Sequence, residues 1–172
     1  MKRIIFTLTA ILLLLVVFNA PAQKGLKFAH IDTQELMKAM PERETAKKTL
    51  EAHAKQLEDQ LLTMQKEFEN KYNDYLSKAD SLADLIRDAK EKELQDLQKR
   101  IQAFQQTAQQ DLQSKEEKLM QPIIDKAKKA IETVAQEQGF IYVFDMSMGV
   151  LLYHSSDSQD ILPLVKAKLG IK

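Results

Sequence analysis

Apolar residues recur at alternating steps of four and three through the middle of the chain. The first series is Leu50, Ala54, Leu57, Leu61, Met64 and Phe68, and it continues less regularly through Tyr72, Tyr75 and Leu82. The second series is Leu94, Leu97, Ile101, Phe104 and Ala108, followed by another step of four to Leu112. This spacing places one narrow apolar stripe on each of two helices, which is typical of a coiled-coil seam. The extra step of four is a stutter, which locally unwinds a supercoil.

Helix-breaking residues are absent between Pro41 and Pro122. All four glycines also lie outside this interval, which is rich in residues that lose little entropy in a helix. We therefore predict an antiparallel helical hairpin, or arm, over residues 42–121. Its bend is expected at 77–82, where Asp80 or Ser81 can cap a new helix. Each helix would extend about 60 Å at about 1.5 Å per residue.

Two flanking regions, residues 23–41 and 122–172, are expected to form a base for the arm. The first contains an apolar run at 26–32 that predicts a strand, and then a short helix at 33–40 for which Asp32 or Thr33 can be the cap. The predicted fold class is α+β and predominantly helical.

The C-terminal part of the base begins with a helix that Gly139 can terminate. Two β-branched and aromatic runs, 140–144 and 150–154, then predict a β-hairpin with a five-residue loop, and a final helix follows Asp160. The predicted inward face of the first of these helices consists of Ile123, Ala127, Ile131 and Val134.

Three short strands in one chain leave sheet edges unpaired, so association of chains through the base is expected. The residues that we assign to this association are Phe28, Ile31, Ile141, Val143, Leu151 and Tyr153.

The N-terminal 22 residues have the pattern of a signal peptide. Lys2 and Arg3 precede an apolar run of about fifteen residues, shorter than the roughly 20 that a spanning helix needs. Small residues at 20 and 22 predict export across the inner membrane with cleavage after Ala22, and an uncleaved anchor is the alternative. No cysteine occurs in the chain, so a disulfide framework and a thiolate metal site are both excluded.

Charge is nearly balanced. The chain has 25 basic and 25 acidic residues, and loss of Lys2 and Arg3 with the signal peptide leaves a net charge of −2. A nucleic-acid-binding protein usually carries a basic stripe, so no nucleic-acid partner is expected. The arm has 14 basic and 17 acidic residues, which gives no basis for predicting contact with an anionic membrane surface.

The pattern of chemically reactive residues predicts no enzyme. His30, His53 and His154 are too widely separated to show metal-ligand spacing, and no Ser-His-Asp arrangement or glycine-rich phosphate loop is present in the sequence. We therefore assign no catalytic, cofactor-binding or metal site and expect no small-molecule substrate.

The order of these elements resembles that of the Skp/OmpH family of periplasmic chaperones over essentially all of the mature chain. The segments that carry the resemblance are 26–32 leading into Pro41, the run from Leu119 to Lys126, Gln138-Gly139-Phe140, and 153–157 followed by Asp160-Ile161. The resemblance implies a homotrimer whose strands build a small β-barrel-like base. It also implies that three arms surround a cavity in which unfolded outer-membrane proteins are held without ATP. The strongly basic arms of well-known family members are not matched here.

Client contacts are expected from adaptable or amphipathic side chains on the arm. The candidates are Met64, Phe68, Tyr72, Tyr75, Leu82, Ile86 and Phe104. Met64, Phe68 and Phe104 also occupy seam positions, where packing of one helix against the other is the simpler expectation. Two other functions stay open, namely an envelope adaptor that docks one partner through its coiled coil, and an enzyme subunit or regulator with a helical stalk.

Overall fold

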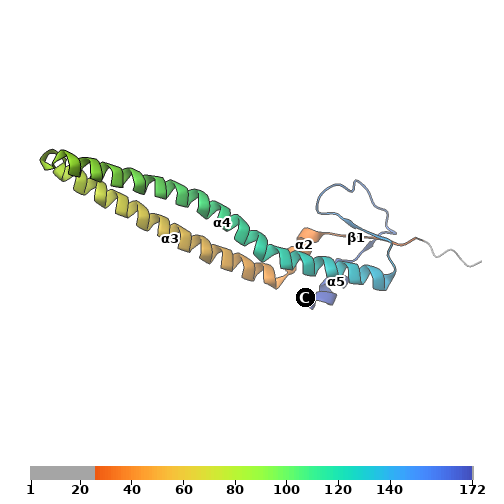
Figure 1. Cartoon of the computed structure of the whole chain (residues 1–172). Coiled ribbons are helices and arrows are strands. Elements are labelled where there is room, and N and C mark those ends of the chain that lie inside the picture. The colour runs from red at the N-terminus through yellow and green to blue at the C-terminus, as the bar shows by residue number, and fades with distance from the viewer. Residues whose placement is uncertain (1–25, 172) are drawn as a thin grey trace, which may run out of the picture.

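A long pair of helices projects from a small mixed base in this computed structural model, which describes residues 26–171 (Figure 1). The predicted signal peptide lies outside the described residues. The elements in chain order are β1 (Phe28–Ile31), α2 (Thr33–Ala39), α3 (Pro41–Lys78), η1 (Ala79–Ser81), α4 (Asp84–Gln138), β2 (Tyr142–Asp145), β3 (Gln159–Asp160) and α5 (Leu162–Leu169). The chain is therefore mostly helical, with one small sheet.

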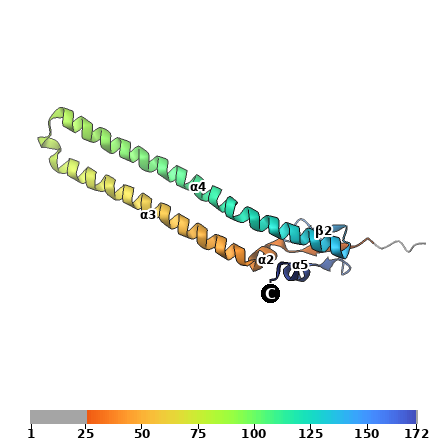
Figure 2. The same ribbon diagram turned by 60° about the horizontal axis from the view of Figure 1, so that its bottom comes forward.

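The helix pair consists of α3 and the first part of α4, which lie side by side and run in opposite directions (Figures 1 and 2). The one-turn helix η1 joins them at the far end, and α4 begins after Ala83, which has extended backbone angles. Pro41 occupies the first turn of α3, where its missing N–H costs no helical hydrogen bond. The free end of the arm is thus defined by residues 79–83.

The sheet is parallel and has the strand order β2-β1-β3. Phe28 pairs with Tyr142 and His30 with Phe144. Because side chains alternate between the two faces along a strand, all four of these side chains lie on the same face of the sheet. Asp32 follows β1 and accepts a hydrogen bond from the Glu35 N–H at 2.9 Å, which caps α2.

The predicted β-hairpin at 140–144 and 150–154 is wrong. Residues 142–145 pair with β1 in parallel, and residues 150–154 form no strand. The third strand is β3, which pairs with the other edge of β1. With this arrangement both edges of the central strand are satisfied, as in the bonds from the Met146 N–H to the Ile31 carbonyl (2.8 Å) and from the Ile161 N–H to the His30 carbonyl (3.0 Å).

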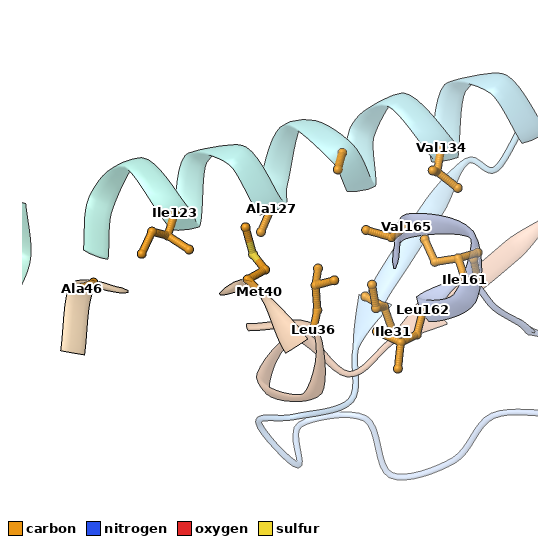
Figure 3. Close-up of a cluster of buried hydrophobic side chains, with 12 residues drawn as sticks. Ile31, Leu36, Met40, Ala46, Ile123, Ala127, Val134, Ile161, Leu162 and Val165 are labelled. Carbon is orange, nitrogen blue, oxygen red and sulfur yellow. The ribbon is translucent and has the colours of Figure 1, made fainter. Parts of the chain in front are cut away.

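The core lies where α4 crosses the sheet and the two short helices α2 and α5 (Figure 3). Its fully buried side chains come from the N-terminal and C-terminal parts of the base, which ties the two ends of the described chain together. The largest of them are Ile31, Leu36, Met40, Ile161 and Val165. Gly139 ends α4 in the left-handed conformation (φ 72°), a conformation that glycine adopts without strain.

Pro122 does not interrupt the helix, although the sequence suggested a break there. It lies inside α4, which is continuous from Asp84 to Gln138. Proline removes the hydrogen bond to the carbonyl four residues earlier, at a cost of about 3 kcal/mol. Beyond the proline, Ile123 and Val134 of α4 are buried in the core. Burial of each such side chain contributes roughly 1.5 to 3 kcal/mol. Tertiary packing therefore maintains the helix through the proline.

Candidate functional site

The arm has a thin apolar seam. Among residues 41–121, only Ala46, Leu94 and Leu97 are buried, and the other seam residues are partly exposed. Two helices alone can cover only one stripe of each other, so the remaining surface of both stays in contact with solvent. The arm consequently presents most of its side chains to any molecule beside it.

Polar contacts between α3 and α4 fix the register of the arm. His53 contacts the Asp111 carboxylate, Lys71 forms an ion pair with Glu93, and the Tyr75 hydroxyl donates to Glu91 at 2.6 Å. The hydrogen bond between Lys71 and Glu93 raises the pKa of Lys71 and lowers that of Glu93. The bond to Glu91 raises the pKa of Tyr75. At neutral pH Lys71 is therefore protonated and Glu93 ionised, so this ion pair is maintained.

The seam departs from the predicted pattern near its end. Lys71, rather than Tyr72, faces α4, and Tyr72 is 44% exposed with its ring stacked on Phe68 (centroids 5.9 Å apart). The long stem of Lys71 can lie along apolar surface while its ammonium reaches Glu93. Because Lys71 occupies the seam position, the ring of Tyr72 is exposed on the arm surface.

The structure separates the candidate client-binding residues into two groups. Tyr72 and Ile86 are exposed on the arm surface. The others are partly buried along the seam and also support packing between helices, namely Met64, Phe68, Tyr75, Leu82 and Phe104.

Three exposed leucines of the arm were missed in the sequence. Leu62 is 53% exposed, Leu76 is 55% exposed, and Leu85, at the start of α4, is 80% exposed. Leu62 and Leu76 lie off the seam, each directly after a seam residue, and Leu85 lies in the first turn of α4, next to the bend. An apolar residue off the seam of a two-helix arm has no partner helix to cover it, and this was the available signal.

A second apolar surface covers the outer face of the sheet, opposite the core. The rings of Phe28, Tyr142 and Phe144 stack on one another with centroids 6.0 to 6.5 Å apart. Phe28 and Phe144 are each 38% exposed. We call these three residues the aromatic face. Their centroid distances are those of stacked aromatic rings, and no helix of the described chain covers them.

Residues 146–158 form a loop that extends away from the helices beside this face (Figure 1). A cavity of about 220 Å³ separates part of the loop from the sheet and is lined by Phe28, Phe144 and Leu151, among others. Leu152, in the middle of the loop, is 95% exposed. So much uncovered apolar surface in one region is typical of an interaction site.

The residues assigned to association fall on both sides of the sheet. Phe28, Ile141 and Tyr153 are exposed, and Leu151, within the loop, is partly buried. The assignment of Ile31 requires correction, because Ile31 is buried in the core of its own chain. Val143 packs against the same core. Alternation along β1 explains why Phe28 and Ile31 differ, since neighbouring residues of a strand point to opposite faces.

Asp145 connects the end of β2 to the start of α2. Its carboxylate accepts hydrogen bonds from the Thr33 hydroxyl (2.6 Å), the Thr33 N–H (3.2 Å) and the Ser147 N–H (2.9 Å). Burial raises the pKa of Asp145, but the bonds from Thr33 and Ser147 together outweigh this effect, so the net shift is downward. The charged form is therefore the stabilising one.

We expect Asp145→Asn to lower the free energy of unfolding by about 1 to 3 kcal/mol at neutral pH, because it removes charge-assisted hydrogen bonds. The folded pKa lies below the ordinary value of 3.8, so the contribution of Asp145 is complete above that value and disappears as the pH falls below it. Chemical denaturation at fixed protein concentration should show the difference at pH 7 and its disappearance near pH 2. An equal difference at both pH values would contradict this role.

In residues 26–171 no group of three or more His, Cys, Asp or Glu side chains is arranged to hold a metal ion. Within the same residues, no helix is both long and apolar enough to cross a membrane.

The geometry is that of a protein with a projecting helical arm and an uncovered apolar base, an architecture suited to contact with other polypeptides. The chain belongs to the OmpH-like family of outer membrane proteins, whose family model matches residues 27–169. No curated protein matches it in sequence. Its fold is similar to that of a Caulobacter crescentus CB15 protein solved as a candidate outer membrane chaperone (OmpH-like), with a TM-score of 0.72, 18% identity, and coverage of 87% of this chain and 86% of the other.

Proposed function

We propose that this protein is a periplasmic holding chaperone that binds unfolded outer membrane proteins and prevents their aggregation without ATP. Membership of the OmpH-like family supports this proposal. The observation that carries it is the exposed apolar surface of the arm, from Leu62 through Tyr72 and Leu76 to Leu85 and Ile86. These side chains are accessible because the arm is only two helices thick.

The physical need for such a surface is clear. A β-barrel protein in transit exposes apolar strands and unpaired strand edges, which aggregate before they reach a membrane. Scattered apolar contacts on the arm would each be weak and replaceable, as a promiscuous binder requires. Weak contacts release the client without nucleotide hydrolysis.

The proposal includes a homotrimer that closes the base. The aromatic face of Phe28, Tyr142 and Phe144 and the loop at 146–158 would be covered by neighbouring copies, and the strands would form a small barrel-like base. Three arms would then surround a cavity, so that one client contacts several arms at once. Combining weak sites in this way raises the total affinity without any strong single contact.

The direct test uses the mature protein and a urea-unfolded outer membrane β-barrel protein, diluted together without nucleotide. We expect light scattering from the client to be suppressed at one trimer per client. Unchanged aggregation at several-fold excess would reject the proposal. Pull-down from envelope extract separates the alternatives, because many unfolded clients support a chaperone and one stoichiometric partner supports an adaptor.

A further inference from the structure

Six glutamines follow one another along α4 at steps of three or four residues. These residues are Gln95, Gln98, Gln102, Gln105, Gln109 and Gln113. All six are exposed, and at about 1.5 Å per residue they extend about 27 Å along the arm. We call this row the glutamine stripe.

The stripe lies beside the seam. Each of its glutamines directly follows a seam residue, as Gln98 follows Leu97 and Gln105 follows Phe104. One residue rotates the helix by about 100°, so the stripe runs parallel to the seam along one side of the arm. Gln95 to Gln109 make no hydrogen bond to other side chains of the described chain, whereas Gln113 donates to Glu117 at 3.3 Å.

The same side of the arm carries exposed apolar residues of α3. Residues that directly follow the seam of α3 lie on that side, because the helices run in opposite directions and both are right-handed. They include Leu62 and Tyr72, which follow Leu61 and Lys71. The pairs His53–Asp111 and Lys71–Glu93 fit one antiparallel register, which places Leu62 level with Gln102.

The part of the arm around Leu62 carries few charges. No charged residue occurs from Ile101 to Gln110 on α4 or from Gln60 to Gln65 on α3. In the register above these two runs lie level only over residues 101–104 of α4, and Lys55 and Glu58, which follow seam residues of α3, lie on the same side near Gln109 and Gln105. The free amides around Leu62 therefore suit an occupant that is rich in hydrogen-bonding groups. An amide side chain both donates and accepts hydrogen bonds, as a peptide backbone does.

We propose that the glutamine stripe and Leu62 bind the backbone of an extended segment of an unfolded client. The glutamine amides bond to its free N–H and C=O groups, and Leu62 contacts an apolar side chain. This inference rests on the proposed chaperone function and identifies what the arm recognises: unpaired strand backbone, independent of sequence.

The spacing indicates loose binding. Successive glutamines lie about 5 Å apart along the helix, whereas every second strand residue recurs at about 6.6 to 6.8 Å. A fixed hydrogen-bond ladder is therefore impossible over the whole stripe. The flexible glutamine side chains can instead form short-lived bonds to any part of the segment, which allows the client to move along the arm.

A matched pair of variants tests the proposal in the full-length mature protein. Gln105→Ala with Gln109→Ala alters the stripe, and Gln106→Ala with Gln110→Ala makes the same change, at the same spacing, on the next face of α4. Alanine favours a helix at least as strongly as glutamine, so both variants should keep the arm. Circular dichroism and thermal melting confirm this before binding is measured.

The probe is a short, end-blocked, uncharged peptide rich in Val, Thr and Tyr, compared with the same peptide methylated at alternate backbone nitrogens. Methylation should weaken binding to the wild type about three- to tenfold, as loss of one or two neutral hydrogen bonds would. In the Gln105/Gln109 variant, which keeps four of the six glutamines, this ratio should be smaller than in the wild type, and in the Gln106/Gln110 variant it should be unchanged.

An unchanged ratio in the stripe variant, or equal losses in both variants, would overturn the inference. A fall in the mass of the wild-type assembly caused by the stripe substitutions would also overturn it, since the occupant would then be another copy of the arm. The client aggregation assay judges the chaperone function separately. If the wild type and both variants suppress aggregation equally, the function stands and backbone recognition by the stripe is rejected.

Discussion

Leu97→Pro is expected to abolish most holding of unfolded clients while the chain still associates through its base. Leu97 is 1% exposed and lies in the seam of α4. Proline there removes a helical hydrogen bond and clashes with the preceding turn, at a cost of about 3 kcal/mol or more. Loss of the buried leucine adds roughly 2 to 5 kcal/mol. The arm should break near its middle, and client aggregation should proceed almost as without chaperone.

A suitable control for this variant is Asp84→Pro. Asp84 is the first residue of α4, where proline needs no helical hydrogen bond and its fixed φ suits the helix. This variant should keep both arm and holding. Loss of association in Leu97→Pro would show that the arm, and not the base, joins the chains.

Phe144→Asp is expected to convert the assembly to monomers that keep their helical content. Phe144 stacks on both other rings of the aromatic face and is partly exposed in the single chain. In a symmetric base the introduced aspartates of all copies would face one another. Like charges juxtaposed across an interface cost several kcal/mol, equivalent to at least about a hundredfold weaker association. Sedimentation equilibrium would measure the change in mass.

Leu164→Asp is the matched control for this second variant. Leu164 is 36% exposed, close to the exposure of Phe144, but it lies on α5, on the core side of the sheet. Its mass should equal that of the wild type. A wild-type mass for Phe144→Asp would mean that the aromatic face is not the association surface.

The helical part of the fold could be predicted because its determinants are local. The missing glycines and prolines between Pro41 and Pro122, together with helix-forming residues, were sufficient to indicate a mostly helical chain with a small base. Apolar spacing could not predict that Lys71, and not Tyr72, occupies the seam position. The position of Lys71 depends on Glu93 of the opposite helix, which gives the lysine an ion-pair partner.

The sheet could not be predicted because strand pairing is non-local. The apolar runs at 140–144 and 150–154 fit a β-hairpin locally, but β1 offered the first run a partner from the other end of the chain. The short β3 has no apolar pattern, since it consists of Gln159 and Asp160. The same limitation misplaced Ile31, whose face of the sheet depends on where α4 and α5 pack.

The exposed side chains of the arm were harder to predict from the sequence than its helices. Seam positions identified which residues join α3 to α4, so the candidates for client contact were biased toward the seam. Leu62, Leu76 and Leu85 were overlooked for this reason, although a two-helix arm leaves such residues uncovered. Their exposure, rather than their spacing, connects the arm to the proposed function.

The most direct test of the central claim is the native mass of the complex that forms when the mature protein meets an unfolded outer membrane β-barrel protein without nucleotide. The proposed function predicts a soluble complex of three copies of this chain with one client. Monomeric chains with no bound client would contradict it, because neither the closed base nor the cavity between arms would then exist.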